Sequence, residues 1–217
     1  MMGRSAAIAC FVVLGVPGFA PVLSAGPARV GQLPARIDIE FHDPQRITLR
    51  LPGDTRDSTF WYLLYKVTNN TGNDVQFFPS FRLVTNTLAV REGGAFISPS
   101  VYGAISARHK REYPFFTLPD KVTGLLLQGA ENARSSAAIF LPFDPRADSF
   151  TIYISGLSDE IHRVSNPAFD AGREESQDNP RSFILRRTLA IVYDLPGDPR
   201  TRGLAKPIRR NRMWTLR

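Results

Sequence analysis

The sequence contains almost no cysteine and little histidine, and both shortages restrict its chemistry. Of its 217 residues, one is a cysteine, Cys10, and three are histidines, His42, His109 and His162. Cys10 lies in a segment that we expect to be removed, so the mature chain would have neither a disulfide nor a reactive thiol. The histidines are far apart and none forms an i, i+4 pair, unlike the ligands of a helical zinc site. We therefore expect no metal and no cofactor.

The sequence also lacks the short motifs of common catalytic and nucleotide-binding sites. Gly156-Leu-Ser158 is followed by aspartate and does not complete the Gly-x-Ser-x-Gly motif of many serine hydrolases. Glu92-Gly-Gly94 has the composition of a turn rather than of a phosphate-binding loop. The Asp-rich stretches at 54–57 and 170–178 lack the alternating oxygen ligands of a calcium loop. We predict a protein that is not an enzyme.

The first 25 residues have the pattern of a signal peptide. Arg4 supplies a positive charge, an apolar run of 11 residues extends from Ala6 to Val16, and Pro17-Gly18 ends it. A membrane-spanning helix needs about 20 apolar residues, so this run is too short to span a bilayer. Small residues at Ala20 and Ala25 give two candidate cleavage sites. We predict a cleaved signal peptide and export to the periplasm or the extracellular space; an uncleaved anchor is the alternative.

The body of the chain, residues 26–196, has the alternating pattern of β-strands. Apolar residues recur at every second position, in segments separated by proline, glycine, asparagine and aspartate. The expected strands cover residues 36–41, 47–51, 59–68, 75–78, 81–87, 121–127, 135–141, 149–155 and 181–195. About 190 residues can bury roughly 70% of their unfolded surface, enough for a core without disulfides. Because alternating strands need a second sheet to cover their inner faces, the pattern predicts an all-β antiparallel sandwich of seven to nine strands.

Two features of this pattern concern how the strands are arranged. The first two strands, on either side of Asp43-Pro44, predict a hairpin or a strand that switches sheets. The central strand is followed by a polar turn at 69–74, after which 75–78 would return as the next strand.

The central strand is apolar on both faces near its beginning, and a helix is expected to cover one of them. Trp61 and Leu63 share one face, whereas Phe60 and Tyr62 share the other. A strand of this kind needs a cover besides the opposite sheet. The segment 98–113 begins with serine followed by proline, a favourable helix start. The inward-facing residues of this helix would be Val101, Tyr102 and Ile105.

Residues 156–181 show no strand pattern and form an acidic segment of 26 residues. Loops of this length are usually functional or disordered. The acidic residues are Asp159, Glu160, Asp170, Glu174, Glu175 and Asp178. A carboxylate pair among them could hydrolyse a polysaccharide by acid–base catalysis; alternatively, the loop is solvated or docks the basic end of the chain.

Positive charge is concentrated at the C-terminal end. The chain has 27 basic and 20 acidic residues, a net charge of +7, and residues 197–217 contribute seven of the basic residues and one acid. The candidates for binding an anionic surface are Arg200, Arg202, Lys206, Arg209, Arg210 and Arg212. A cationic extension on a neutral body could bind an anionic envelope polymer, and we do not expect nucleic acid as the partner. In the alternative, Ile208, Met213, Trp214 and Leu216 hold the tail against its own domain.

Several segments resemble the immunoglobulin-like, telokin-like domains of exported bacterial proteins. They are Leu63–Gly72, Phe81–Thr85, Leu127–Glu131, Ala137–Phe140 and Phe150–Gly156. In that pattern a strand ending in Val-x-Asn precedes a polar turn, and a later Gly-Glu turn precedes a strand ending in phenylalanine. Here Ala130 separates the glycine from the glutamate.

The chain as a whole also resembles a family of exported bacterial proteins of unknown function. The segments that carry this likeness are Ala107–Lys110, Asp194–Asp198 and Ala205–Arg210. Both resemblances imply a sandwich fold and an extracytoplasmic location, and neither assigns a catalytic residue.

The sequence therefore predicts three parts: a signal peptide at 1–25, a sandwich domain at 26–196 and a basic tail at 197–217. The expected function is non-enzymatic, with a binding or structural role toward another extracytoplasmic protein. The alternatives are a tail that tethers the domain to an anionic surface or polymer, and a carboxylate-dependent polysaccharide hydrolase.

Overall fold

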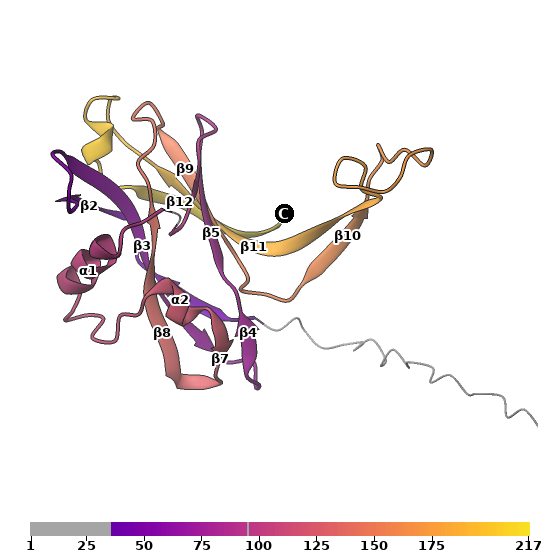
Figure 1. The fold of residues 1–217 in the computed structure, drawn as a ribbon, viewed down its shortest axis with the longest axis horizontal. Helices are drawn as coiled ribbons and strands as arrows, with labels where there is room; N and C mark the ends of the chain where they lie inside the picture. Colours follow the sequence, from indigo (N-terminus) through magenta and orange to yellow (C-terminus); the bar gives the residue numbers. More distant parts are fainter. Residues whose placement is uncertain (1–35, 95) are drawn as a thin grey trace, which may run out of the picture. The chain divides into compact units, whose positions relative to one another are not determined.

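The structure is a computed structural model and describes residues 36–94 and 96–217; the expected signal peptide at 1–25 lies outside this part. Two antiparallel sheets face each other (Figure 1). The four-stranded sheet contains β1 (Asp38–Phe41), β2 (Gln45–Arg50), β3 (Asp57–Asn69) and β8 (Gly129–Phe140). The six-stranded sheet contains β5 (Ser80–Thr85), β6 (Val90–Glu92), β9 (Ser149–Ser155), β10 (Ile161–Ser165), β11 (Ser182–Asp194) and β12 (Ile208–Leu216). The predicted all-β sandwich is confirmed.

Three short helices and a small sheet complete the described part of the chain. The helices are α1 (Pro99–Arg108), α2 (Pro119–Val122) and the 3-10 turn η1 (Arg202–Leu204), and the small sheet pairs β4 (Val75–Phe77) with β7 (Gly124–Leu126). Two expectations are wrong here. Residues 119–122 form a helix where a strand was expected to begin, and β4 pairs with β7 rather than returning along β3.

The main core lies between the two sheets. From β3 it includes Trp61, Leu63, Tyr65 and Val67, the face that alternation predicted. The six-stranded sheet supplies buried residues from β5, β9 and β11, among them Leu83, Phe150, Ile152, Ile154, Leu189, Ile191 and Tyr193. The inner faces of the two sheets therefore cover each other, as the alternating pattern requires.

Helix α1 covers the other face of β3, as predicted. Phe60, Tyr62 and Leu64 form a second cluster with Val101, Tyr102 and Ile105 of the helix. All six residues are buried. The strand is therefore buried on both faces, between the opposite sheet and the helix.

The two longest strands are each paired, along one edge, with two short strands in succession. Residues 65–68 of β3 pair with β1 and residues 57–62 pair with β2. Between β1 and β2 the His42 N–H donates to the Leu64 carbonyl at 3.0 Å, and Pro44 has no N–H to donate. The chain bulges at this point and continues along the same edge, so both the hairpin and the sheet-switching prediction are wrong. β9 and β10 follow one edge of β11 in the same manner.

The basic C-terminal segment includes the last strand of the six-stranded sheet. β12 pairs with β11 along its length, on the edge opposite β9. Trp214 lies across from Leu189 and packs against the main core. Of the two alternatives, the structure shows the one in which the segment lies on its own domain. Trp214 makes this contact, whereas Ile208, Met213 and Leu216 are exposed, at 57%, 44% and 40%.

β10 and the first half of β11 form a hairpin arm, residues 161–186, that extends beyond the sandwich (Figure 1). The expectation of one irregular segment at 156–181 is therefore wrong for 161–165. The turn at the end of the arm is ordered by Asn179, which is 3% exposed. Its side-chain nitrogen donates to the Asp170 carbonyl at 3.0 Å, and its side-chain oxygen accepts from the Asp170 N–H at 2.9 Å.

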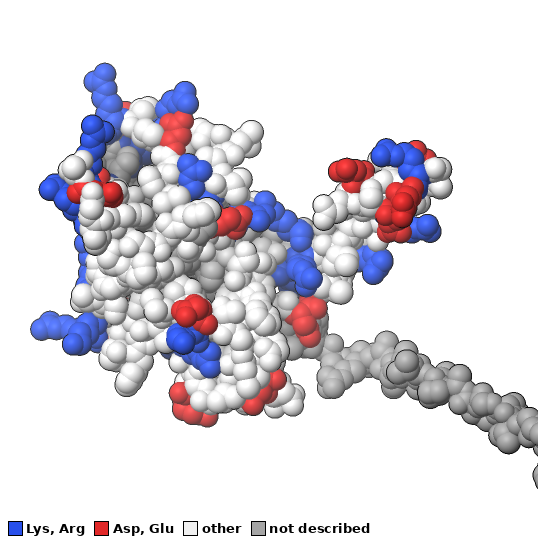
Figure 2. All heavy atoms as spheres, in the orientation of Figure 1, with Lys and Arg blue, Asp and Glu red and all other residues white. Residues whose placement is uncertain are grey.

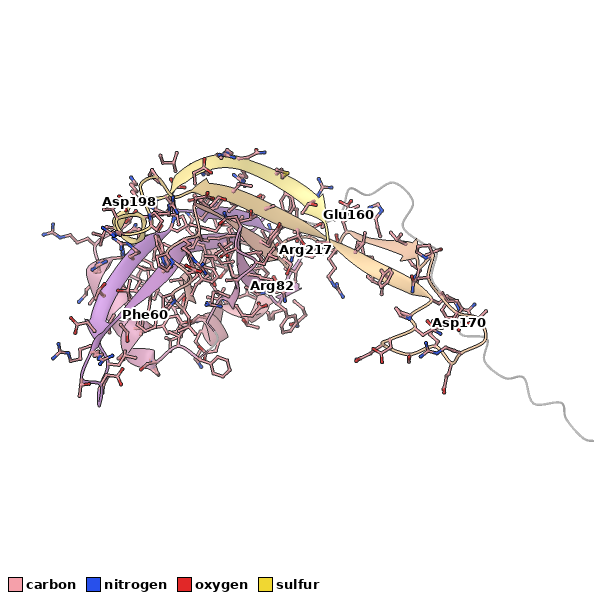
Figure 3. The ribbon with its side chains drawn as sticks, turned by 90° about the horizontal axis from the view of Figure 1, so that it is seen from above. Phe60, Arg82, Glu160, Asp170, Asp198 and Arg217 are labelled. Carbon is pink, nitrogen blue, oxygen red and sulfur yellow. The ribbon has the colours of Figure 1, made fainter. Side chains whose placement is uncertain are left out.

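An ion pair holds the root of the arm. Arg187 of β11 donates to the Glu160 carboxylate, which also lies 3.1 Å from the His162 ring. Figure 3 shows Glu160 at the root and Asp170 at the far end. The hydrogen bonds from Arg187 and His162 lower the pKa of Glu160 below its ordinary value.

We expect Ile105→Ala to destabilise the domain by about 2–5 kcal/mol, because it leaves a cavity between α1 and β3. Urea unfolding would measure the change. The matched control is Ala107→Ser on the exposed side of the same helix, which should change the unfolding free energy by less than about 0.5 kcal/mol. Equal effects of the two substitutions would contradict the role of α1 as a cover.

We expect Glu160→Gln to lower the melting temperature at neutral pH and to have little effect in acid. Because the folded-state pKa is lowered, the contribution of Glu160 is fully present above the ordinary pKa of glutamate, about 4.3. It is lost as the pH falls through the lowered value. Thermal unfolding of both proteins at neutral and acidic pH tests this. A difference in melting temperature that persists unchanged in acid would show that the ion pair is not its source.

Candidate functional site

A cleft lies at one end of the sandwich, between β2, β3 and the segment 197–207. It consists of two adjoining hollows with volumes of about 540 Å³ and about 360 Å³. Arg46, Trp61 and Leu204 line both hollows, so the two hollows adjoin at these residues. We call this region the Arg46 cleft. Basic side chains gather at the end of the domain where β2, α1 and η1 lie (Figure 2).

Arg46 is at the centre of the cleft. Its guanidinium carbon lies 5.4 Å from the centre of the Trp61 ring. Within the described residues, no carboxylate lies within ion-pair distance of Arg46. Partial burial lowers the pKa of Arg46, because a desolvated cation without a counter-ion is unfavourable. An anion bound in the cleft would relieve this cost.

The other cations of the cleft are supplied by the segment that follows β11. Lys206 lines the larger hollow, and Arg200 and Arg202 line the smaller one. The single acidic residue among those lining the two hollows is Asp43, which lies 3.4 Å from Arg209 and accepts a hydrogen bond from the Tyr193 hydroxyl at 3.1 Å. The cleft therefore has an excess of positive charge.

A compact turn fixes this segment against the sandwich. Asp198 accepts hydrogen bonds from the N–H groups of Arg200 and Thr201, at 2.8 and 3.1 Å, and these bonds lower its pKa. Arg202 donates to the carbonyls of Gly197 and Arg146, at 2.8 and 2.9 Å. Gly197 has a φ of 98°, a conformation that favours glycine. The turn thus holds Arg202 in a defined position, and Figure 3 labels Asp198 at this end of the domain.

The structure divides the six predicted basic residues into two groups. Arg200, Arg202 and Lys206 line the Arg46 cleft. Arg209, Arg210 and Arg212 belong to β12. In that strand, Arg209 pairs with Asp43 at 3.4 Å, Arg210 pairs with Asp194 at 2.8 Å, and Arg212 lies 5.3 Å from the centre of the Phe41 ring. Sequence reasoning did not find Arg46, because nothing near it in the sequence sets it apart from other strand arginines.

A polar cluster joins the cleft to α1. The buried Tyr62 hydroxyl donates to Gln45 at 3.0 Å and lies 3.0 Å from the His109 ring. His42, which lines the larger hollow, lies 3.1 Å from Glu112. Burial lowers the pKa of His109, so the ring is neutral near pH 7. The cluster attaches the end of the helix to the strands that form the floor of the cleft.

The other candidates from the sequence lie apart from this cleft. Four of the acidic residues, Asp170, Glu174, Glu175 and Asp178, are exposed on the turn of the arm, and no hollow described for the domain is lined by them. Among the described residues no group of three or more His, Cys, Asp or Glu side chains could hold a metal ion. Over the same residues, no helix has both the length and the apolar character needed to span a bilayer.

Comparisons with known proteins add no relative. The chain matches no protein-family model, no curated protein and no solved structure. The resemblance to exported sandwich domains therefore rests on the sequence segments alone, and export stays a prediction.

Proposed function

We propose that the protein is an exported, non-enzymatic binding module that holds an anionic polymer in the Arg46 cleft. The observation that carries this proposal is the partly buried Arg46 guanidinium, which has no acidic partner among the described residues and lines both hollows. Lys206, Arg200 and Arg202 add three further cations around it. Carboxylate or phosphate groups are the chemistry that such a set of guanidinium and ammonium groups recognises.

The form of the cleft favours an extended ligand over a single small anion. The two hollows follow one another across Leu204, whose side chain is 75% exposed. A polymer lying over Leu204 would place successive anionic groups in the two hollows. In this proposal, the basic segment 197–217 binds the polymer through residues that the turn at Asp198 holds in place. It does not act as the free electrostatic arm considered from the sequence.

We expect Arg46→Ala to weaken binding of polygalacturonate or polyphosphate by about tenfold or more, equivalent to about 1.4 kcal/mol or more. Binding would be measured by calorimetry with the purified protein, and neutral dextran should not bind. The matched control is Arg173→Ala, which removes an exposed arginine from the turn of the arm and should leave the affinity unchanged. Wild-type affinity should also fall steeply between about 0.05 and 0.3 M salt, because the contacts are ionic.

Equal affinities of the Arg46→Ala and Arg173→Ala proteins would reject this site. Chain cleavage of either polymer by the wild-type protein, lost on substitution of Glu174 or Glu175, would instead support the hydrolase alternative.

A further inference from the structure

A second cationic hollow lies on the outer face of the six-stranded sheet, away from the Arg46 cleft. Its volume is about 190 Å³. The residues that line it come from β5, β9 and β11, together with Arg217, which follows β12. They are Ser80, Arg82, Tyr153, Ser155, Arg186, Thr188 and Arg217. Figure 3 shows Arg82 and Arg217 close together, between the sandwich and the arm.

Two of its arginines are held directly opposite each other by the backbone. The N–H of Arg186 donates to the main-chain oxygen of Arg217 at 2.7 Å, and the N–H of Arg217 donates to the Arg186 oxygen at 3.1 Å. Residues paired in this way place their side chains on the same face of the sheet. Like charges directly opposite each other destabilise a sheet. An anion between the two guanidinium groups would remove this repulsion.

The arginines and hydroxyl residues around this pair lie at defined positions on the sheet. Arg217 stacks on the Tyr153 ring, with its guanidinium carbon 3.9 Å from the ring centre. Tyr153 lies opposite Arg82 in the sheet, and Ser155 lies opposite Ser80. Arg82 is also paired with Glu92 at 2.6 Å, so the Glu92 carboxylate is already engaged. No ion pair joins Arg186 or Arg217 to an acidic side chain of the described chain.

We propose that this hollow binds a tetrahedral oxyanion, the phosphate or sulfate group of a larger molecule, between Arg186, Arg217 and Arg82. Guanidinium groups match the geometry of such oxyanions through paired N–H donors. The neighbouring hydroxyls of Ser80 and Ser155 would complete the donor set. The proposal does not rest on ligand binding in the Arg46 cleft.

Exposed apolar residues beside the hollow indicate what the oxyanion could be attached to. Ile161 lies opposite Arg186 on the arm, and Ile184 lies opposite Arg163. Both isoleucines are at least half exposed, at 56% and 50%. The same anion chemistry could therefore come from inorganic phosphate or sulfate, or from a lipid headgroup whose chains contact the isoleucines.

The test is an NMR titration of the isotope-labelled full chain carrying Arg46→Ala, which weakens binding in the Arg46 cleft, and the signals followed are those of residues that line the second hollow. Inorganic phosphate and sulfate are the first probes. We expect shifts of the Ser80, Tyr153 and Thr188 amide signals, and at least about tenfold weaker binding when Arg186 and Arg217 are both replaced by alanine. Arg186→Lys should retain part of the affinity, whereas Arg173→Ala should retain all of it.

Vesicles of phosphatidylglycerol and of phosphatidylcholine distinguish the sources of the oxyanion. Binding to phosphatidylglycerol alone, lost in the double alanine variant and reduced by Ile184→Ser, would assign the site to a lipid headgroup. Absence of binding to phosphate, sulfate and both vesicles would overturn the proposal. So would binding that the double variant, still folded by its melting curve, retains in full.

Discussion

Strand β3 is buried on both faces over residues 60–65, and most of the domain is arranged to cover it. One face of the strand packs against the six-stranded sheet and the other packs beneath α1. If the pairing of β3 slipped by one residue, every side chain would turn to the opposite face. Because the two faces pack against different partners, the register of the strand is strongly specified. β2 pairs with one edge of β3, and this pairing places Arg46 opposite Trp61 and over its ring. The position of the Arg46 cleft therefore depends on the edge pairing of β3.

Arginine serves two purposes in this protein. Several guanidinium groups are structural: Arg187 binds Glu160 at the root of the arm, and Arg202 donates to main-chain carbonyls in the turn after β11. Others lie over aromatic rings without an acidic partner among the described residues, as Arg46 does over Trp61 and Arg217 over Tyr153. Stacking of this kind holds a guanidinium group in place and leaves its N–H donors, which point outward in the plane of the group, free to bind. Some arginines thus hold parts of the fold together, and others form two separate surfaces suited to anions.

Local features of the fold could be predicted from the sequence, whereas pairing partners and the cleft could not. The two faces of β3 could be predicted from the alternation of apolar residues, and helix α1 (Pro99–Arg108) from the proline at its start, because both signals act over a few positions. The helix ends at Arg108, before the expected Tyr113. Bulges such as that at Pro44 depend on the neighbouring strand, so β1 and β2 could not be recognised as one interrupted edge. The Arg46 cleft joins residue 46 to residues 200–206, which only the folded chain brings together. Three of the six predicted cations line it, and the other three belong to β12, whose pairing with β11 the sequence does not indicate.

The hydrogen bond between Tyr193 and Asp43 joins positions 150 residues apart in the chain, and it has a kinetic consequence. Contacts of such long sequence separation require the closure of large loops before they contribute stability, so domains dominated by them fold slowly, in milliseconds to seconds. Asp43 lies between β1 and β2 of the four-stranded sheet and Tyr193 belongs to β11 of the six-stranded sheet, so this contact can form only once both sheets are present. Until then, the apolar edges of β3 and β11 would be open to other chains, and the rate of loop closure would set how long the newly made protein remains vulnerable to aggregation.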